Sequence, residues 1–317
     1  MNWGIIGYGE ITPSFIEGLQ TVKGSRLVGI ATVSSFEYLK NKKLYGEVKV
    51  FKSYEELVKI PGIDIVYIST TNNLHFENTA LCIREGKHIL CEKPLTPTFK
   101  QTKELFHLAR KNNVFLMEGM WTRFLPSYRK FIELLNKNII GKPKLLKADF
   151  GFYSNWPKYR RLLNPALYGG TLLDNTDYNI FLSQDVFREY PSEINAQATF
   201  AGTGVEDACS ILLKYPSGGM AQLFSSFRCE TKQEAIVYGE KGYIVLKEYW
   251  HGTKIDVMVN KINKKFNFPH KVNGFEYEIE SVEKAIKNGK LENELLTYKE
   301  SEEVAKITDK VKILIRE

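Results

Sequence analysis

The chain has 317 residues, of which 43% are hydrophobic, enough for a large core and for two domains. Its 44 Lys and Arg residues exceed its 37 Asp and Glu residues and give a formal net charge of +7. Because the basic residues are spread along the chain rather than grouped in runs, we expect a solvated surface and no nucleic-acid partner.

The cysteines and the apolar segments indicate where the protein works. Cys82, Cys91, Cys209 and Cys229 stand far apart and have neither metal-ligand nor redox spacing, so we expect reduced thiols and no metal site. No apolar run approaches the ~20 residues of a membrane span. The chain enters an expected strand at Asn2 without a basic, apolar leader. We therefore expect a cytoplasmic protein that does not associate with membranes.

A glycine-rich turn joins a strand to a helix at the start of the chain. Residues 3–6 form a short apolar run, and from Ile11 apolar residues recur every four positions, as in one stripe of a helix. In the turn between them, Gly7 permits a tight bend and Gly9 lets the backbone approach a pyrophosphate at the helix N-terminus. Thr12 occupies the third small position of this dinucleotide fingerprint, so the match is partial. An ordinary glycine turn is the alternative.

The end of the second expected strand, residues 26–33, bears on the choice of cofactor. An NAD enzyme often has Asp or Glu there, and an NADP enzyme an Arg. This chain has Thr32-Val33-Ser34-Ser35, which carries neither marker. Lysines at 40, 42 and 43 are typical of a solvated helix. NAD and NADP therefore both remain open.

Strands and helices alternate up to about residue 119, which predicts a doubly wound parallel sheet, as in a Rossmann domain. A polar loop, residues 70–75, follows the strand at 63–68; it could hold cofactor hydroxyls or contain only turn formers. The strand at 87–90 runs into Cys91-Glu92-Lys93-Pro94-Leu95. Pro94 stiffens this turn, and an ammonium at the carboxyl end of a strand suits a cofactor crevice.

The pattern changes after about Gly141. Apolar residues alternate with polar ones around 148–152 and 194–200, and further strands are expected at 209–215, 219–228, 234–238, 243–246 and 255–259. Short turns separate several of them, which favours antiparallel pairing. We therefore expect a second, α+β domain at 120–317 with a large, mostly antiparallel open sheet, after the dinucleotide-binding domain at 1–119. Two amphipathic helices near the C-terminus are assigned to packing.

The glycine turn, the loop at 70–75 and Glu92-Lys93-Pro94 occur in an order and at separations that resemble the glucose-fructose oxidoreductase/inositol dehydrogenase (Gfo/Idh/MocA) family. The run at 117–126 is similar to that of the dihydrodiol dehydrogenase and D-xylose dehydrogenase branch. The resemblance covers essentially the whole chain. It implies that cofactor contacts come from Gly7, Gly9, Glu10, Ile11, Thr32, Thr70, Asn72, His75, Glu92 and Lys93.

Residues 169–178 resemble the family motif Gly-Gly-x-Leu-x-Asp-x-Gly-x-(His or Tyr), whose last position is the proton-transfer residue. This implies a catalytic role for Tyr178 and a weaker one for Asp174; from the residues alone, a core aromatic and a helix cap would be favoured. Thr176 replaces the motif glycine, which leaves its effect on catalysis open. The substrate contacts implied are Trp121, Arg123, Trp156 and Asp177.

The implied reaction is hydride transfer between NAD(P) and a secondary alcohol or hemiacetal carbon. A tyrosine with an ordinary pKa of ~10 is a weak base at neutral pH, and a nearby ammonium lowers its pKa. Lys93 and Tyr178, brought together across the domain cleft, would therefore form an acid–base pair. The substrate stays open among carbohydrate-like compounds: sugars, polyols, dihydrodiols and sugar-derived amines.

Two other functions remain as alternatives. A non-catalytic dinucleotide-binding regulator would fit Thr176 and the missing ribose marker. A reductase of a conjugated double bond would need no tyrosine base. Whichever function holds, we expect a homodimer or homotetramer. The face of the second sheet that no helix covers would form the contact, as is common in the family.

Overall fold

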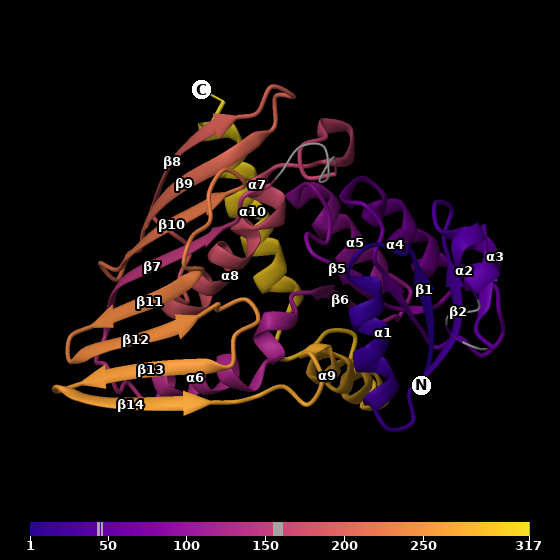
Figure 1. Cartoon of the computed structure of the whole chain (residues 1–317), viewed down its shortest axis with the longest axis horizontal. Helices are drawn as coiled ribbons and strands as arrows, with labels where there is room; N and C mark the ends of the chain where they lie inside the picture. The colour runs from indigo at the N-terminus through magenta and orange to yellow at the C-terminus, as the bar shows by residue number, and fades with distance from the viewer. Residues whose placement is uncertain (43–44, 46, 155–160, 317) are drawn as a thin grey trace. The chain divides into compact units, whose positions relative to one another are not determined.

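The computed structural model describes residues 1–42, 45, 47–154 and 161–316, and the chain divides into two compact units (Figure 1). The first unit comprises Met1–Trp121 and Lys271–Ser301, and the second comprises Thr122–His270 and Glu302–Glu317. The domain boundary expected after Gly119 lies close to the one at Trp121. The segment 271–301, which we expected in the second domain, groups with the first unit.

The first unit contains a six-stranded sheet in the order β3-β2-β1-β4-β5-β6, in which all neighbouring strands are parallel. This confirms the expected doubly wound sheet, whose order reverses between β1 and β4. Its elements are β1 (Asn2–Ile6), α1 (Thr12–Thr21), β2 (Arg26–Ala31), α2 (Phe36–Lys42), β3 (Lys49–Phe51), α3 (Tyr54–Val58), β4 (Ile65–Ile68), η1 (Asn72–Leu74), α4 (His75–Arg84), β5 (His88–Glu92), α5 (Phe99–Lys111), β6 (Leu116–Gly119) and α9 (Phe275–Lys287).

Helix α9 packs against α1 through an aromatic contact and through a close approach of the two backbones at a glycine. Phe275 packs edge-on against Phe15, with ring centroids 5.8 Å apart. At Gly18 the two backbones come so close that an added Cβ would lie 2.9 Å from the Cβ of Phe275. Phe15 in turn stacks on Tyr67 of β4 at 3.6 Å. One face of the sheet is thus covered by an N-terminal helix and a helix more than 250 positions later.

The second unit contains an eight-stranded sheet in the order β14-β13-β12-β11-β7-β10-β9-β8. Its neighbouring strands are antiparallel except for the parallel pair of β7 and β10, which confirms the expected mostly antiparallel sheet. The strands are β7 (Pro143–Gly151), β8 (Glu193–Phe200), β9 (Glu206–Lys214), β10 (Met220–Ser226), β11 (Glu234–Gly239), β12 (Gly242–Lys247), β13 (Lys254–Val259) and β14 (Ile262–Asn267). The helices are η2 (Trp121–Phe124), which spans the unit boundary, α6 (Pro126–Asn136), η3 (Pro165–Leu167), α7 (Thr171–Asp174), α8 (Thr176–Phe187) and α10 (Tyr298–Leu314), which begins in the first unit.

Strand β14 was not among the expected strands. Its residues are mostly exposed and include Lys264 and Lys265, so it lacks the apolar alternation by which strands are recognised. It forms by pairing with β13 at the edge of the sheet. Lysines on an edge strand also discourage pairing with another chain.

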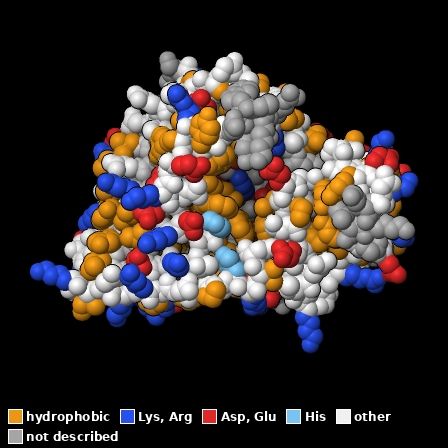
Figure 2. Space-filling model, in the orientation of Figure 1, with side chains coloured by type: hydrophobic (Ala, Val, Ile, Leu, Met, Phe, Trp, Pro, Cys, Tyr) orange, Lys and Arg blue, Asp and Glu red, His pale blue; other side chains and the backbone are white. Residues whose placement is uncertain are grey.

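Helices cover one face of this sheet, as Figure 1 shows for α8, which packs on β7 and β10. Along β7, Leu146, Ala148 and Phe150 are buried on the helix side, whereas Lys147 and Asp149 point to the opposite face. Basic and acidic side chains are interspersed on the face of the molecule seen in Figure 2. No helix in the described ranges has both the length and the apolar character needed to cross a membrane.

Candidate active site

The glycine turn after β1 forms a cradle of backbone amides. Gly7 has φ +94°, and its N–H donates to the carbonyl oxygen of Ala31 at 2.8 Å. An added Cβ at Gly7 would lie 2.7 Å from backbone atoms of Ser69 and Thr70, so only glycine fits there. The bend directs the chain into α1, whose N-cap residue Ile11 makes no side-chain cap bond. The N-terminus of α1 is therefore not covered by the side chain of its N-cap residue.

Thr12, which occupies the third small position of the fingerprint, stabilises the glycine turn through its hydroxyl. Its side chain is fully buried, and its Oγ1 accepts the N–H of Gly9 at 3.0 Å. The same Oγ1 lies 2.9 Å from Oγ of Ser69 at the end of β4. The hydroxyl thus joins the glycine turn to the neighbouring strand, and the departure from the fingerprint supports the turn.

This cradle fits a dinucleotide. Gly9 is exposed, and an added Cβ would meet only the carbonyl oxygen of Ser69, at an ordinary 3.6 Å. The described residues therefore leave open the space next to the Cα of Gly9. Exposed amides at a helix N-terminus, at the switch point of a doubly wound sheet, suit a pyrophosphate.

Hydroxyl groups gather at the end of β2, where the adenosine ribose is expected. Thr32 is buried and its Oγ1 accepts the N–H of Ser35 at 3.4 Å. The Tyr8 and Tyr45 hydroxyls lie 2.7 Å apart beside this turn. Two of the lysines that the sequence places nearby have side chains outside the described residues, at positions 42 and 43. Among the described residues, neither a carboxylate bonded at Thr32 nor an arginine is found there, so the arrangement leaves NAD and NADP both open.

The Lys93 turn is held from three sides. His75 contacts the carbonyl oxygen of Pro94 through Nδ1 at 2.8 Å and that of Thr70 through Nε2 at 3.1 Å. Oε1 of Glu118 accepts the N–H of Leu95 at 2.8 Å. The hydroxyl of Tyr67 donates to Oε1 of Glu92 at 2.5 Å.

These contacts join the loop after β4 to the turn after β5. The Lys93–Pro94 peptide is cis, and Lys93 is half-buried. Asn72 in the same loop is buried. Of the residues expected to contact the cofactor, the first unit thus holds the loop at 70–75 and the Lys93 turn at the carboxyl ends of adjacent strands.

A buried acid on α9 lies near this turn and was not predicted from the sequence. Glu278 is fully buried, and its carboxylate oxygens have no hydrogen-bond partner among the described residues. Burial, and then the charge of Glu92, raise the pKa of Glu278 well above its ordinary value. A single glutamate in a helix rich in glutamates carries no sequence signal of burial. The apolar stripe of α9 predicts packing alone.

In the second unit, α7 and α8 position the family motif. Asp174 ends α7, and its Oδ1 accepts from Nη1 of Arg161 at 3.1 Å. Tyr178 lies in the first turns of α8 and is 8% exposed. Thr176, in place of the motif glycine, begins α8 and is buried, and its hydroxyl has no partner in the part of the chain that the structure describes.

Aromatic rings surround Tyr178. Its ring centroid lies 5.6 Å from that of Phe150 on β7 and 6.2 Å from that of Trp250, which follows β12. Phe150 and Trp250 stack on each other at 5.1 Å, and His251 stacks on Trp250 at 3.8 Å. We did not predict a site role for Phe150 or Trp250. They lie 100 positions apart, and only the pairing of β7, β11 and β12 brings them together.

The expected substrate residues have different surroundings. Arg123 is buried and bonds both oxygens of Asp185, with Nε at 3.0 Å from Oδ2, which also accepts the hydroxyl of Tyr128 at 2.6 Å. Asp177 is buried on α8. Trp121 belongs to the first unit, where its ring stacks on Phe275 at 4.5 Å. Trp156 lies outside the described residues.

Comparisons with known proteins cover the whole chain. Residues 1–120 match the family model described as "Oxidoreductase family, NAD-binding Rossmann fold", and residues 128–245 match the "GFO/IDH/MocA C-terminal domain". The trans-1,2-dihydrobenzene-1,2-diol dehydrogenase of Xenopus tropicalis is 35% identical over 321 residues, which cover 97% of this chain and 96% of the relative.

Solved structures share the fold. A 3-ketoreductase from Actinomadura kijaniata, KijD10, in complex with NADP and TDP-benzene, has a TM-score of 0.90 at 22% identity and covers 99% of this chain and 98% of its own. Levoglucosan dehydrogenase in complex with NADH and levoglucosan has a TM-score of 0.86 at 17% identity, with 100% and 97% covered. Both domains match in this order, and the chain belongs to the Gfo/Idh/MocA family of oxidoreductases.

Proposed function

We propose that this protein oxidises a secondary alcohol on a flat or six-membered ring, such as a cyclic trans-diol or a sugar, and that Tyr178 is the proton acceptor. The chain is an NAD(P)-dependent dehydrogenase acting on CH–OH groups. Relatives named trans-1,2-dihydrobenzene-1,2-diol dehydrogenase and a fold neighbour named levoglucosan dehydrogenase support the choice of ring.

The first unit would hold the cofactor. The backbone at Gly9 would let the pyrophosphate approach, the amides of Glu10 and Ile11 would bind it, and Thr32 and the loop at 70–75 would meet the ribose hydroxyls. When bound, the nicotinamide accepts or returns the hydride. The contacts of His75 and Glu118 keep the Lys93 turn rigid, so that the ammonium is presented at a defined place.

Proton transfer is the task of the protein's own residues. As the alcohol carbon loses hydride, its hydroxyl proton must be taken up, and we assign this to the phenol oxygen of Tyr178. The ammonium of Lys93 would favour the phenolate form by its charge. Asp174, bonded to Arg161, would keep the end of α7 in place before Tyr178.

The observation that carries the ring preference is the packing of Phe150 and Trp250 against Tyr178. Trp250 is half-buried, and its ring centroid lies 6.2 Å from that of the phenol. Aromatic faces bind flat rings and the C–H faces of sugars, and they exclude water from the proton transfer. A substrate with a hydroxyl at the edge of an apolar ring fits these surroundings.

A screen tests the function. Cyclic trans-diols, aldoses, polyols and acyclic alcohols are offered with NAD and with NADP, and the absorbance of the reduced nicotinamide is followed. Turnover of ring alcohols above acyclic ones is expected. Binding of the dinucleotide without turnover of any alcohol would favour the non-catalytic regulator. Oxidation of the reduced cofactor by a conjugated enone alone would favour the double-bond reductase.

Variants test the acid–base pair. Lys93→Met and Tyr178→Phe are each expected to lower kcat by ~10²–10⁴-fold while sparing cofactor affinity. The double variant should be little worse than the poorer single variant, because the two residues act as one unit. In Lys93→Met, the base should titrate at higher pH in the kcat profile. Near-normal turnover in Tyr178→Phe would rule out this mechanism and leave Tyr178 as a core aromatic.

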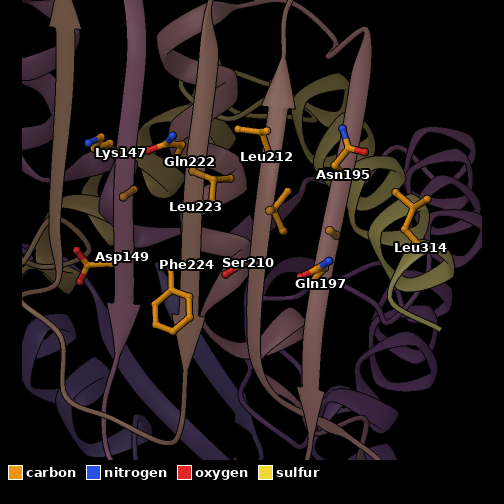
Figure 3. A pocket seen from close by; sticks show the side chains of 13 residues that line it. Lys147, Asp149, Asn195, Gln197, Ser210, Leu212, Gln222, Leu223, Phe224 and Leu314 are labelled. Carbon is orange, nitrogen blue, oxygen red and sulfur yellow. The ribbon is translucent and has the colours of Figure 1, made fainter. Parts of the chain in front are cut away.

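We further propose that the protein forms a homodimer or homotetramer through the face of the second unit's sheet that α8 does not cover. Figure 3 shows this face, where β7 to β10, together with Leu314 at the end of α10, line a hollow of about 630 Å³. Leu212 and Met220 are 36% and 37% exposed on these strands, and Lys147 and Asp149 carry opposite charges on one strand. A twofold axis could bring such a face against itself. Leu212→Glu is expected to lower the mass seen by sedimentation, whereas a monomeric wild type would refute the proposal.

We also propose that the protein is located in the cytoplasm. All four cysteines are free thiols, and three of them are buried. Thiols persist in reducing compartments. Fractionation of cells that express the protein tests this.

A further inference from the structure

Gln233 lies just before β11, at a point where three strands of the second sheet meet. Strand β11 pairs with β7 on one side and with β12 on the other. The backbone N–H of Gln233 donates to Oδ2 of Asp149 on β7 at 2.8 Å. Its carbonyl oxygen accepts the N–H of Tyr249, just after β12, at 3.3 Å. Gln233 is therefore fixed to both neighbours of its own strand.

Both ends of its side-chain amide are also bonded. Oε1 accepts the indole N–H of Trp250 at 2.8 Å, and Nε2 donates to the carbonyl oxygen of Gly151 at 3.2 Å. An indole nitrogen can only donate and a carbonyl oxygen can only accept, so a single orientation of the amide satisfies both. Glutamate could keep the bond to Trp250 but would place a carboxylate oxygen against Gly151. Leucine could make neither bond.

The backbone at this position would suit a different residue. Gln233 has φ +55°, in the left-handed region that favours glycine and, to a lesser degree, asparagine or aspartate. A side chain is nevertheless present, and its two polar atoms are both used. An observed strained residue of this kind points to a task for its side chain.

The bond to Trp250 fixes the ring that lies beside Tyr178. Phe150 and His251 both stack on the Trp250 ring, at 5.1 and 3.8 Å. Stacking restrains the tilt of the indole but allows it to slide or turn in its plane. The directional bond from Nε1 to Gln233 removes that freedom.

We propose that Gln233 is a positioning residue, which holds the Trp250 ring beside Tyr178 and thereby sets the preference for flat-ring alcohols. The inference rests on the proposed function, in which Tyr178 takes the proton from a ring alcohol. It adds a determinant of specificity just before β11, a strand with no assigned role in the reaction.

The first measurement does not need activity. Gln233→Leu, Gln233→Gly and Gln233→Glu are made in the wild type and in Trp250→Phe, and each pair of emission spectra is subtracted to isolate the signal of Trp250. Leucine and glycine at 233 are expected to shift this emission and to raise its quenching by iodide. Glutamate, which keeps the indole bond, should change it less. Gln20→Leu, on the exposed end of α1, is the control.

The Gln233→Gly variant distinguishes the effect of the side chain from the effect of the backbone conformation. It relieves the left-handed strain, so it also keeps the test available if the leucine variant fails to fold. Wild-type emission in Gln233→Gly would mean that only the backbone conformation matters, and it would overturn the positioning role.

The second measurement is selectivity. The ratio of kcat/KM for the trans-dihydrodiol of benzene to that for an acyclic polyol is expected to fall roughly tenfold in Gln233→Leu, the factor of a well-placed ring contact. In the Trp250→Phe background, the same change should alter the ratio by less than about twofold, because the indole N–H is already gone. Changed emission with an unchanged ratio would overturn the specificity role. An inactive wild type with changed emission would refute the proposed function and the specificity role, but not the positioning contact.

Discussion

Two glycines after β1 are expected to respond to substitution in opposite ways. At Gly7, φ is +94° and an added Cβ would lie 2.7 Å from the backbone of Ser69 and Thr70. At Gly9, φ lies outside the left-handed region, and a Cβ would have one ordinary contact at 3.6 Å. We therefore expect glycine at 7 to be required by the fold and glycine at 9 to be required by the ligand.

The magnitudes follow from these contacts. In Gly7→Ala, a left-handed alanine costs ~1–2 kcal/mol, and overlap with a rigid backbone adds ~1–3 kcal/mol. In Gly9→Asp, the lost freedom of the unfolded chain and the favourable helix N-terminus each contribute up to ~1 kcal/mol of stability. A carboxylate ~4 Å from a phosphate charge is repelled by about 4 kcal/mol near a protein surface. That energy corresponds to roughly a thousandfold in Kd.

Urea denaturation and calorimetric titration with NADH and NADPH measure the two effects separately. Gly9→Asp should keep or raise the free energy of unfolding and lose the dinucleotide, while Gly7→Ala should lose several kcal/mol of stability. Gly9→Asn has nearly the same bulk without the charge, so its smaller loss of affinity isolates the steric part. Wild-type affinity in a folded Gly9→Asp would place the pyrophosphate elsewhere. A loss of stability equal to that of Gly7→Ala would refute the contact argument.

Three further outcomes are expected. Burial raises the pKa of Glu278, so the folded state retains a proton that the unfolded chain releases, and the free energy of unfolding falls as pH rises from ~4 toward the raised pKa. In urea denaturation, the Glu278→Gln variant should therefore have a higher free energy of unfolding than the wild type at pH 8 and an equal one near pH 4. A difference in the free energy of unfolding that stays the same at both pH values would contradict this. Thr176→Val, which removes a buried hydroxyl without a partner among the described residues, should raise the free energy of unfolding by ~1 kcal/mol. Lower stability would show that the hydroxyl is satisfied. The kcat/KM values with NAD and NADP should differ by less than about tenfold, and a strong, salt-insensitive NAD preference would show that the ribose contact at Thr32 is misplaced.

Local patterns in the sequence predicted the parts of the protein that are built from adjacent residues. A glycine turn between a strand and a helix depends on residues within one or two turns of each other, and it is found where expected. The same holds for the alternation that predicts the parallel sheet. The motifs at Lys93 and Tyr178 indicated the family to which the chain belongs, and the comparisons confirm that family. Their catalytic roles stay predictions.

The tertiary structure decided which distant residues share a site. Helix α9 was expected in the second domain, but its Phe275 packs on Phe15, and an apolar stripe alone does not say which surface it will cover. Glu278 became a buried acid by the same packing. Trp250 and Gln233 come into contact because β11 pairs between β7 and β12 in one register. A shift of this register by one residue would turn their side chains to the other face of the sheet. Such contacts depend on the register of strands far apart in the chain, and no spacing within a single sequence encodes that register.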